Sequence, residues 1–188
     1  ACYRAFRSGD YQNQKDLYEE LGTKGQTPKV LLIGCIDSRV DPSDIFNAYP
    51  GQMFVTRNVA NLVPSPDQND SFHGTTAAIE FAVEVVGVEM IVVMGHESCG
   101  GIKGCIAGLG HDPDGGYVNK WVSQINHVHD RLKERDLSDK DMQLEMELET
   151  VRQSLENLMK FDFIREKVEA GKLSLQGAYF SIIQAKLM

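Results

Sequence analysis

Two short segments of the chain carry side chains that bind metals. The first contains Cys35, Asp37 and Arg39, and the second contains His96 and Cys99 followed by two glycines. Two thiolates, an imidazole and a carboxylate are ligands that zinc accepts in tetrahedral sites. Cys35, His96 and Cys99 would fill three positions around one ion, which leaves the fourth for Asp37 or for water. The sequence therefore predicts one zinc ion per chain with an exchangeable position.

The Asp37 and Arg39 pair bears on that fourth position. Taken alone, the two residues could form an ordinary salt bridge or cap a turn. Beside a metal, a bidentate arginine would hold the carboxylate away from zinc and leave water bound. We expect this open arrangement at neutral pH, with Asp37 as a fourth ligand only in a closed state.

Both segments follow apolar runs that are typical of buried parallel strands. We predict strands over 29–33, 53–56 and 90–94, and a helix over 75–86 between the last two. Strand, helix and strand in this order indicate an α/β fold with a mostly parallel central sheet flanked by helices. Because ligands bind at the carboxyl ends of parallel strands, Cys35 and His96 are expected to meet there. The apolar stripe predicted for the helix consists of Ala77, Ala78, Phe81, Ala82 and Val85.

The remaining chain is predicted to be helical, with a closing strand. Residues 3–21 indicate one or two helices that end at Gly22. The later helices are expected over 118–134, 144–158 and 161–169, and one or two edge strands over 173–187. With 188 residues and 42% hydrophobic content, the chain is expected to form one domain. Its parts would be an arm over 1–22, a zinc-site core over 29–110, and helices with the closing strand over 117–188.

The composition and charge of the chain restrict the partners it is expected to bind and the compartment in which it is expected to lie. A formal net charge of −8 argues against nucleic acid and anionic membranes. No apolar stretch approaches the roughly 20 residues of a membrane span. The four cysteines are too few for a disulfide framework, which favours a reducing compartment. The cytoplasm is the default location, and an organelle is the alternative if a targeting segment preceded Ala1.

Other residues that could carry chemistry do not form a recognisable site. The glycines around 95–101 lack the Lys-Ser/Thr that ends a phosphate loop, and Ser98 does not lie in a Gly-x-Ser-x-Gly elbow. His127 and His129 are two residues apart, so on a helix they cannot share a metal, and we predict exposed helix histidines. Cys2 and Cys105 are given no role.

The metal-binding segments resemble the signature of the β-class carbonic anhydrases. The likeness covers roughly residues 3–183 and includes Gly25-Gln26-x-Pro28-Lys29, Arg57-Asn58-Val59-Ala60-Asn61 and His73-Gly74-Thr75-x-Ala77-Ala78-Ile79-Glu80. It implies zinc bound by Cys35, His96 and Cys99, and reversible hydration of carbon dioxide to bicarbonate and a proton by zinc-bound hydroxide. Asp37 and Arg39 would then form the catalytic dyad that orients this oxygen, and Gln26 would belong to the substrate pocket.

The same resemblance implies a dimer or a larger homo-oligomer. The amino-terminal arm would reach across to another subunit, and the substrate pocket would lie at the subunit interface. Carbon dioxide is apolar and needs a small hydrophobic pocket. The residues expected to line it are Ile36, Phe54, Val59 and Phe81, and the Gly100 N–H is expected to contact bicarbonate.

Two other functions use the same ligands. Relatives that hydrolyse carbonyl sulfide or carbon disulfide share the zinc motif, and the bulky Ile36 beside the metal could suit a more apolar substrate. A non-catalytic, zinc-stabilised module for bicarbonate sensing or protein interaction would keep Asp37 on the metal, although the presence of Arg39 and Gln26 argues against it.

Overall fold

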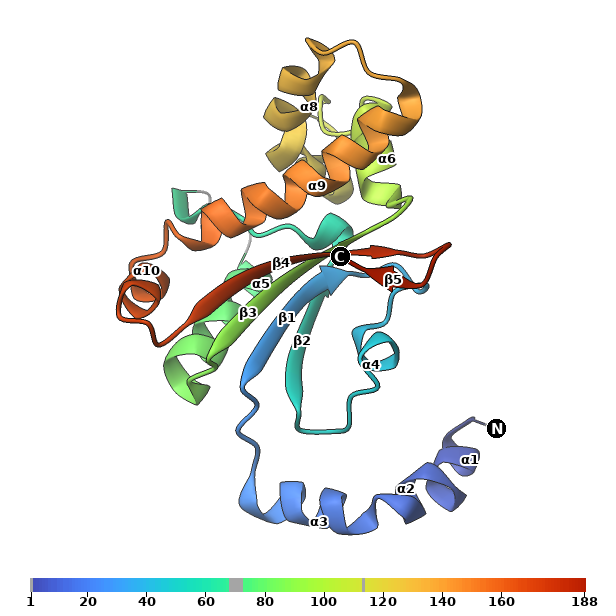
Figure 1. Cartoon of the computed structure of the whole chain (residues 1–188), viewed down its shortest axis with the longest axis vertical. Coiled ribbons are helices and arrows are strands. Elements are labelled where there is room, and N and C mark those ends of the chain that lie inside the picture. Colours follow the sequence, from blue (N-terminus) through green and yellow to red (C-terminus); the bar gives the residue numbers. More distant parts are fainter. Residues whose placement is uncertain (1, 68–72, 113) are drawn as a thin grey trace.

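A twisted sheet forms the centre of the computed structural model, which describes residues 2–67, 73–112 and 114–188 (Figure 1). Among these residues the strand order is β2-β1-β3-β4-β5. The first four strands are parallel, and β5 is antiparallel to β4. The strands are β1 (Val30–Cys35), β2 (Met53–Asn58), β3 (Met90–His96), β4 (Ser174–Ser181) and β5 (Lys186–Leu187). The predicted mostly parallel α/β architecture is confirmed.

Three strands, β1, β2 and β3, run further than the sequence predicted, and the extra residues of β1 and β3 include candidate ligands. β1 continues to Cys35 and β3 to His96, so both metal-binding side chains are the last residues of neighbouring strands. The last residues of β1 and β2 are also paired, Cys35 with Asn58. The carboxyl ends of three adjacent strands therefore converge, as the sequence predicted for a parallel sheet.

The amino-terminal arm consists of three short helices, α1 (Cys2–Ser8), α2 (Asp10–Asn13) and α3 (Lys15–Lys24). None of them contains a buried residue. The arm extends below the sheet in Figure 1, away from the helices at the other end of the molecule. The predicted end at Gly22 is wrong, because the helix continues to Lys24 and stops at Gly25, whose φ of 82° a glycine adopts without strain.

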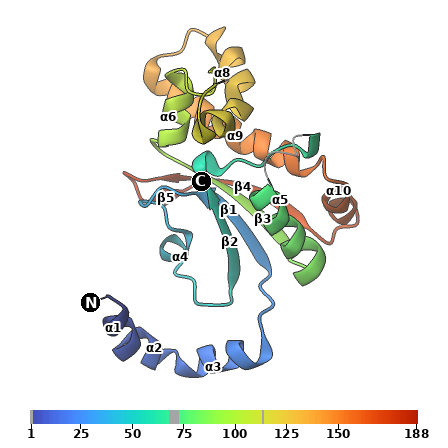
Figure 2. The same cartoon turned by 180° about the vertical axis from the view of Figure 1, so that it is seen from behind.

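The helix between β2 and β3 is present, but of the predicted apolar stripe only Ala82 is fully buried. It consists of α5 (His73–Glu80) and a π-helical segment, η3 (Phe81–Val86), which lie against the sheet (Figure 2). The buried side chains are Thr75, Ile79, Ala82 and Val83. Phe81 and Val85 from the predicted stripe are 51% and 69% exposed. The helix has apolar residues on two faces, and the core takes the one that contains Ile79.

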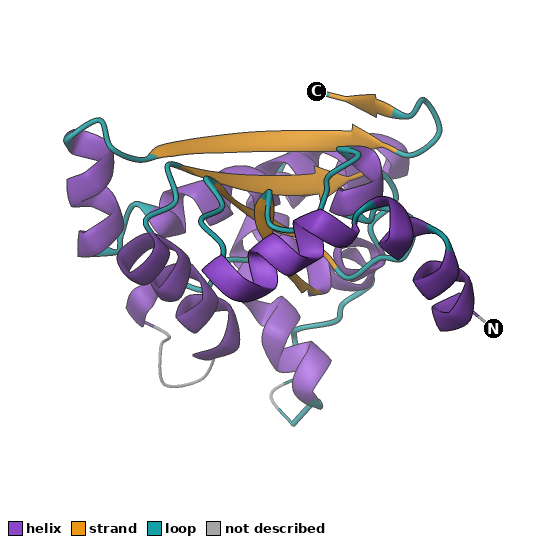
Figure 3. Cartoon of the chain, turned by 90° about the horizontal axis from the view of Figure 1, so that it is seen from below, coloured by secondary structure: helices purple, strands orange, loops and turns teal. Residues whose placement is uncertain are grey.

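The remaining helices flank the sheet, and in Figure 3 most helices lie below the uppermost strand. They are α4 (Pro42–Ile45), α6 (Gly100–Ile106), α7 (Tyr117–Val122), α8 (Asn126–Lys133), α9 (Asp139–Leu158) and α10 (Asp162–Glu169), with 3-10 turns η1 (Val59–Asn61) and η4 (Ser123–Ile125). α9 begins earlier than predicted, because the Ser138 side chain caps its first turn by accepting from the Asp141 N–H. Among the described residues, no helix is both long and apolar enough to cross a membrane.

Two apolar clusters hold these elements together. The first joins the strands to α5, η3 and α10 and includes Leu31, Ile79, Ile91 and Ile164. The second lies among α6, α7, α8 and α9 and contains Cys35 and Cys99 themselves. The predicted metal ligands are therefore part of a packed interior, which fixes their positions.

Candidate metal centre

Cys35, His96 and Cys99 come together at the carboxyl edge of the sheet. Their ligand atoms all lie within 4.8 Å of one another, and the two sulfur atoms are 3.9 Å apart. All three side chains are buried. Cys35 and His96 end adjacent strands, and Cys99 is the N-cap residue of α6, so each ligand position is fixed by an element boundary.

The His96 ring is oriented as a metal ligand requires. Its Nδ1 lies 3.0 Å from the Glu97 carbonyl oxygen, which can only accept, so Nδ1 carries the proton. Nε2 is buried and has no hydrogen-bond partner among the described residues. A buried acceptor nitrogen beside two sulfur atoms costs free energy unless a cation binds it. The donor set and its geometry therefore fit zinc.

The two thiols influence each other's ionisation. A hydrogen bond with Cys99 lowers the pKa of Cys35, despite burial, and His96 contributes in the same direction. The same hydrogen bond raises the pKa of Cys99, and burial adds to this effect. One thiolate thus forms readily and the second is opposed by the first. A divalent cation removes that opposition, since zinc binds both sulfurs as thiolates.

Asp37 and Arg39 form the predicted pair beside this cluster. Arg39 donates from Nε to Oδ1 at 2.9 Å and from Nη2 to Oδ2 at 2.7 Å, and its backbone N–H donates to Oδ1 at 3.0 Å. These bonds hold the pKa of the Asp37 carboxyl well below its usual range. The ionised Oδ2 lies 4.0 Å from His96 Nε2. A carboxylate thus borders the space between the ligands while it is bound to arginine.

Arg57 organises the loop that carries this pair, although its sequence context suggested only membership of a family motif. Its Nε donates to the Cys35 carbonyl oxygen at 2.8 Å, and Nη2 donates to the Asp37 carbonyl oxygen at 2.6 Å. Nη1 pairs with the Asp41 carboxylate at 2.8 Å. One side chain from β2 thereby fixes the backbone on both sides of Ile36. Its position near the carboxyl end of β2, beside the strand that ends at Cys35, is the signal that could have revealed this role.

Glu147 in α9 was not predicted as a site residue, although it contacts a predicted ligand directly. It is 3% exposed, and its Oε1 accepts from the Cys99 N–H at 2.9 Å and from Gln143 at 2.6 Å. Its Oε2 accepts from the Tyr179 hydroxyl at 2.7 Å. The helical spacing that places Glu147 on the same face as the buried Val151 and Ser154 could have revealed it.

The turn before Cys99 is held from two sides. Ser98 has a φ of 57°, which non-glycine residues seldom adopt. Arg39 Nη2 donates to the Ser98 carbonyl oxygen at 3.1 Å, while Glu147 holds the next N–H. After the turn, α6 packs so closely against η1 that a Cβ on Gly101 would lie 2.7 Å from the Val59 side chain. These contacts couple the dyad, the ligand and the helix.

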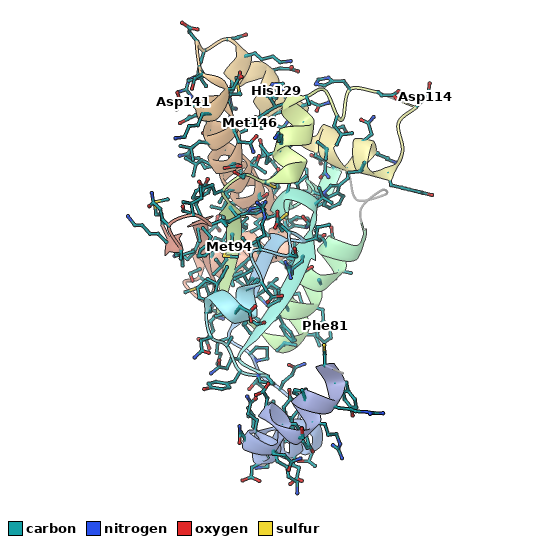
Figure 4. The ribbon with its side chains drawn as sticks, turned by 90° about the vertical axis from the view of Figure 1, so that its right-hand side faces the viewer. Phe81, Met94, Asp114, His129, Asp141 and Met146 are labelled. Atoms are coloured by element: carbon teal, nitrogen blue, oxygen red, sulfur yellow. The ribbon has the colours of Figure 1, made fainter. Side chains whose placement is uncertain are left out.

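The residues predicted to line the substrate pocket divide into two groups. Ile36, Val59 and Gly100 lie next to the ligand positions in sequence or packing, and Ile36 is 57% exposed. Phe54 and Phe81 instead contact each other, with ring centroids 6.1 Å apart. Phe54 pairs in register with Leu31, four residues before Cys35. In Figure 4, Phe81 lies toward the arm, well away from Met94 near the end of β3.

Gln26, like Phe54 and Phe81, lies far from the ligand cluster. It is exposed and precedes β1, so it lies at the opposite end of that strand from Cys35. Within one chain, Gln26, Phe54 and Phe81 therefore do not reach the cluster. Their role at the substrate stays a prediction, and it requires these residues to come from another copy of the chain.

Comparisons with known proteins agree with this site. A family model described as carbonic anhydrase matches residues 30–187. β carbonic anhydrase 3 from Arabidopsis thaliana is 37% identical over 183 residues, which cover 95% of this chain and 70% of that protein. The structure of the β-carbonic anhydrase CcaA has a TM-score of 0.89 and 30% identity, with 98% of this chain and 82% of that chain covered.

The chain is also similar to one of two tetrameric β-carbonic anhydrases from the filamentous ascomycete Sordaria macrospora, with a TM-score of 0.87 and 29% identity. The match covers 100% of this chain and 92% of that chain. Family model, sequence relatives and fold agree, and this chain belongs to the β-class carbonic anhydrases.

Proposed function

We propose that the chain catalyses the reversible hydration of carbon dioxide to bicarbonate and a proton, with Cys35, His96 and Cys99 holding one zinc ion. The observation that carries this proposal is the bidentate Asp37–Arg39 pair beside the ligands. A purely structural zinc site would be closed by a fourth protein ligand. Here the nearest carboxylate is bound to arginine, which leaves a coordination position for a reactant.

Zinc, when bound, acidifies a water molecule and so supplies the nucleophile for carbon dioxide. Asp37 and Arg39 would orient that nucleophile. The ionised Asp37 can only accept a hydrogen bond, and its Oδ2 faces the space between the ligands. A hydroxyl that donates to Oδ2 would direct its lone pair elsewhere, toward a substrate. Arg39 keeps the carboxylate charged and in place.

Ser98 and Cys99 support this geometry from the other side. Arg39 binds both Asp37 and the Ser98 carbonyl oxygen, so Asp37 and the turn that leads into Cys99 are held by the same side chain. A shift of either would move the other, which ties the orientation of the nucleophile to the metal. The Gly100 N–H belongs to the first turn of α6 and has no intrahelical acceptor in such a position. It is available to an anionic product such as bicarbonate.

We also propose that the active form is a homo-oligomer. Phe54, Phe81 and Val85 form an apolar face, which we call the aromatic face: the two rings touch, and Phe81 and Val85 are adjacent on the helix. Two of the three are more than half exposed. An exposed apolar patch of this kind marks an interaction site. A second copy would cover it and could bring Gln26 and Phe81 to the metal site.

Stopped-flow measurement of carbon dioxide hydration, on protein whose zinc content has been determined, tests the proposal. We expect activity proportional to zinc content and rising from neutral to alkaline pH. Carbonyl sulfide hydrolysis is measured on the same samples. Zinc-loaded protein that leaves carbon dioxide unchanged but releases sulfide would overturn the substrate assignment. Inactivity toward both compounds, with one tightly bound zinc per chain, would instead indicate a closed, non-catalytic site.

A further inference from the structure

A second group of metal-binding side chains lies among the helices at the far end from the arm. His111, His129 and Asp130 each offer a ligand atom, and these atoms lie within 4.8 Å of one another. His129 and Asp130 belong to α8, and His111 lies in the loop after α6. Figure 4 places His129 in this layer of helices, on the other side of Met94 from Phe81. The prediction that His129 is exposed is wrong, because only 3% of it is accessible.

The loop that carries His111 is fixed against α8. Asn126 donates from Nδ2 to the Gly110 carbonyl oxygen at 2.7 Å. Gly110 has a φ of 101°, and a Cβ there would lie 2.6 Å from the Asn126 side-chain oxygen and 3.0 Å from the Ser123 nitrogen. Only glycine fits such a close approach. His111, the next residue, is therefore held beside the helix.

Helical spacing places His129 and Asp130 beside this loop. Positions 126, 129 and 130 are related by three and four residues, so they share one face of α8. That face is the one to which Asn126 binds the loop. His127 lies elsewhere, because its Nε2 contacts Gln153 Oε1 at 2.8 Å. The loop after α6 and helix α8 thus bring three possible metal ligands together. The Asn126–Gly110 hydrogen bond holds the two segments in contact without a metal.

The His129 imidazole has a nitrogen atom that is free to bind a metal ion. Its Nδ1 is buried and has no hydrogen-bond partner among the described residues. Burial, followed by the nearby Lys133, lowers the pKa of this imidazole, while Asp130 opposes the shift and His111 reinforces it. The neutral imidazole is the form that binds a metal ion. The lowered pKa therefore favours the metal-binding form of His129.

We propose that His111, His129 and Asp130 form a second metal site, for a divalent transition-metal cation such as zinc. Two imidazoles and one carboxylate suit zinc, cobalt or nickel and do not suit calcium or magnesium, which require oxygen ligands. Water would complete the coordination, because His111 and Asp130 are exposed. The site lacks thiolates, so it binds more weakly than the cluster of Cys35, His96 and Cys99.

One contact competes with metal binding. Lys133 lies 3.5 Å from an Asp130 oxygen, and both side chains are more than half exposed. An exposed pair of this kind contributes little, so a divalent cation can displace it. Bound metal would link the loop after α6 to α8. Because α6 begins directly after Cys99, the second site would stabilise the far end of the helix that follows a catalytic ligand.

The test is the zinc content of tag-free, full-length protein after equilibrium dialysis at rising free zinc concentration. We expect about one ion per chain at low free zinc and about two at higher zinc. His111→Ala should lose only the second ion, and because His111 is exposed the variant should fold. His127→Ala, which removes another histidine of α8, should keep both ions. A second ion that survives His111→Ala, or wild-type protein that stops at one, would overturn the proposal.

Cobalt distinguishes this site from the catalytic one. Cobalt bound by Cys35 and Cys99 should give a strong thiolate-to-metal absorption in the near ultraviolet, whereas the second site should give only weak visible bands. Cys35→Ser should remove the strong band and keep the weak ones, which Cys35→Ser combined with His111→Ala should then lose. Weak bands that persist in the double variant would refute the assignment. The result does not depend on whether the chain hydrates carbon dioxide.

Discussion

The ligand cluster and the aromatic face differ in how completely one chain covers their side chains. Cys35, His96 and Cys99 are buried, and backbone or side-chain contacts fix each position. Phe81 and Val85 are exposed although they are apolar. The helix that carries them has already used its other face to fill the core. One chain therefore brings the three candidate ligands together in its interior and leaves the aromatic face uncovered.

This difference separates two kinds of function. The three proposed zinc ligands come from one chain, so zinc binding should survive changes at the aromatic face. The proposed substrate pocket needs residues of a second copy, so catalysis should respond to association between copies. Substitutions at the ligand cluster, the dyad and the aromatic face test that separation. They are given in order of the expected effect, from the loss of both zinc and activity to a small loss of zinc affinity.

Cys35→Ser should abolish tight zinc binding and carbon dioxide hydration together. The hydroxyl of serine is a far weaker zinc ligand than a thiolate, and the two remaining ligands cannot hold the ion. Zinc analysis after dialysis against a chelator, followed by stopped-flow kinetics, measures both effects. The control is Cys2→Ser, an exposed cysteine outside the cluster, which should change neither. Full zinc content in Cys35→Ser would contradict the ligand assignment.

Arg39→Ala should reduce turnover by about 100-fold while zinc content stays unchanged. Without arginine, the pKa of the Asp37 carboxyl returns toward its ordinary range, and the carboxylate is free to move onto the metal. Arg39→Lys keeps the charge but loses the bidentate geometry, so we expect an intermediate rate. The measurement is stopped-flow hydration with zinc determined on the same sample. Arg165→Ala, in an exposed ion pair on α10, is the control. An unchanged rate in Arg39→Ala would argue against a catalytic dyad.

The sequence predicted the part of the site that depends on local patterns. The existence and order of the strands follow from the apolar runs, although their last residues do not, and the candidate ligands Cys35, His96 and Cys99 follow from residue type and spacing. Glu147 lies 48 positions after Cys99 in a different element, and its contact with the Cys99 N–H depends on tertiary packing. No local pattern contains that contact.

The buried face of the helix over residues 73–86 shows the same limit. Periodicity indicated an apolar stripe that includes Phe81, Ala82 and Val85. Of these three only Ala82 is buried, and the core takes Ile79 and Val83 instead. When a helix has two apolar faces, spacing alone cannot choose between them. Similarly, nothing local to His129 reveals that the loop after α6 covers it.

Val85→Asp should weaken association of the chain by about 30-fold without loss of zinc. The new carboxylate lies on the exposed aromatic face, and burying it against another copy would leave a charge without a partner. Sedimentation as a function of protein concentration measures the effect. Val118→Asp, a similar exposed change near the start of α7, should leave association unchanged. If Val85→Asp associates as the wild type does, the aromatic face is not the interface.

Glu147→Gln should have the smallest effect, a weakening of zinc affinity by about tenfold. The substitution keeps the shape of the side chain but replaces charge-assisted hydrogen bonds to the Cys99 N–H and the Tyr179 hydroxyl with weaker neutral ones. The turn that carries Cys99 then becomes less firmly held, while all three ligands remain. Competition with a chelator measures the affinity, with Glu156→Gln on the exposed side of α9 as the control. Equal affinities in the two variants would show that packing alone positions Cys99. A loss confined to Glu147→Gln would place α9 among the elements that determine metal binding, and would separate the buried support of the ligands from the open aromatic face.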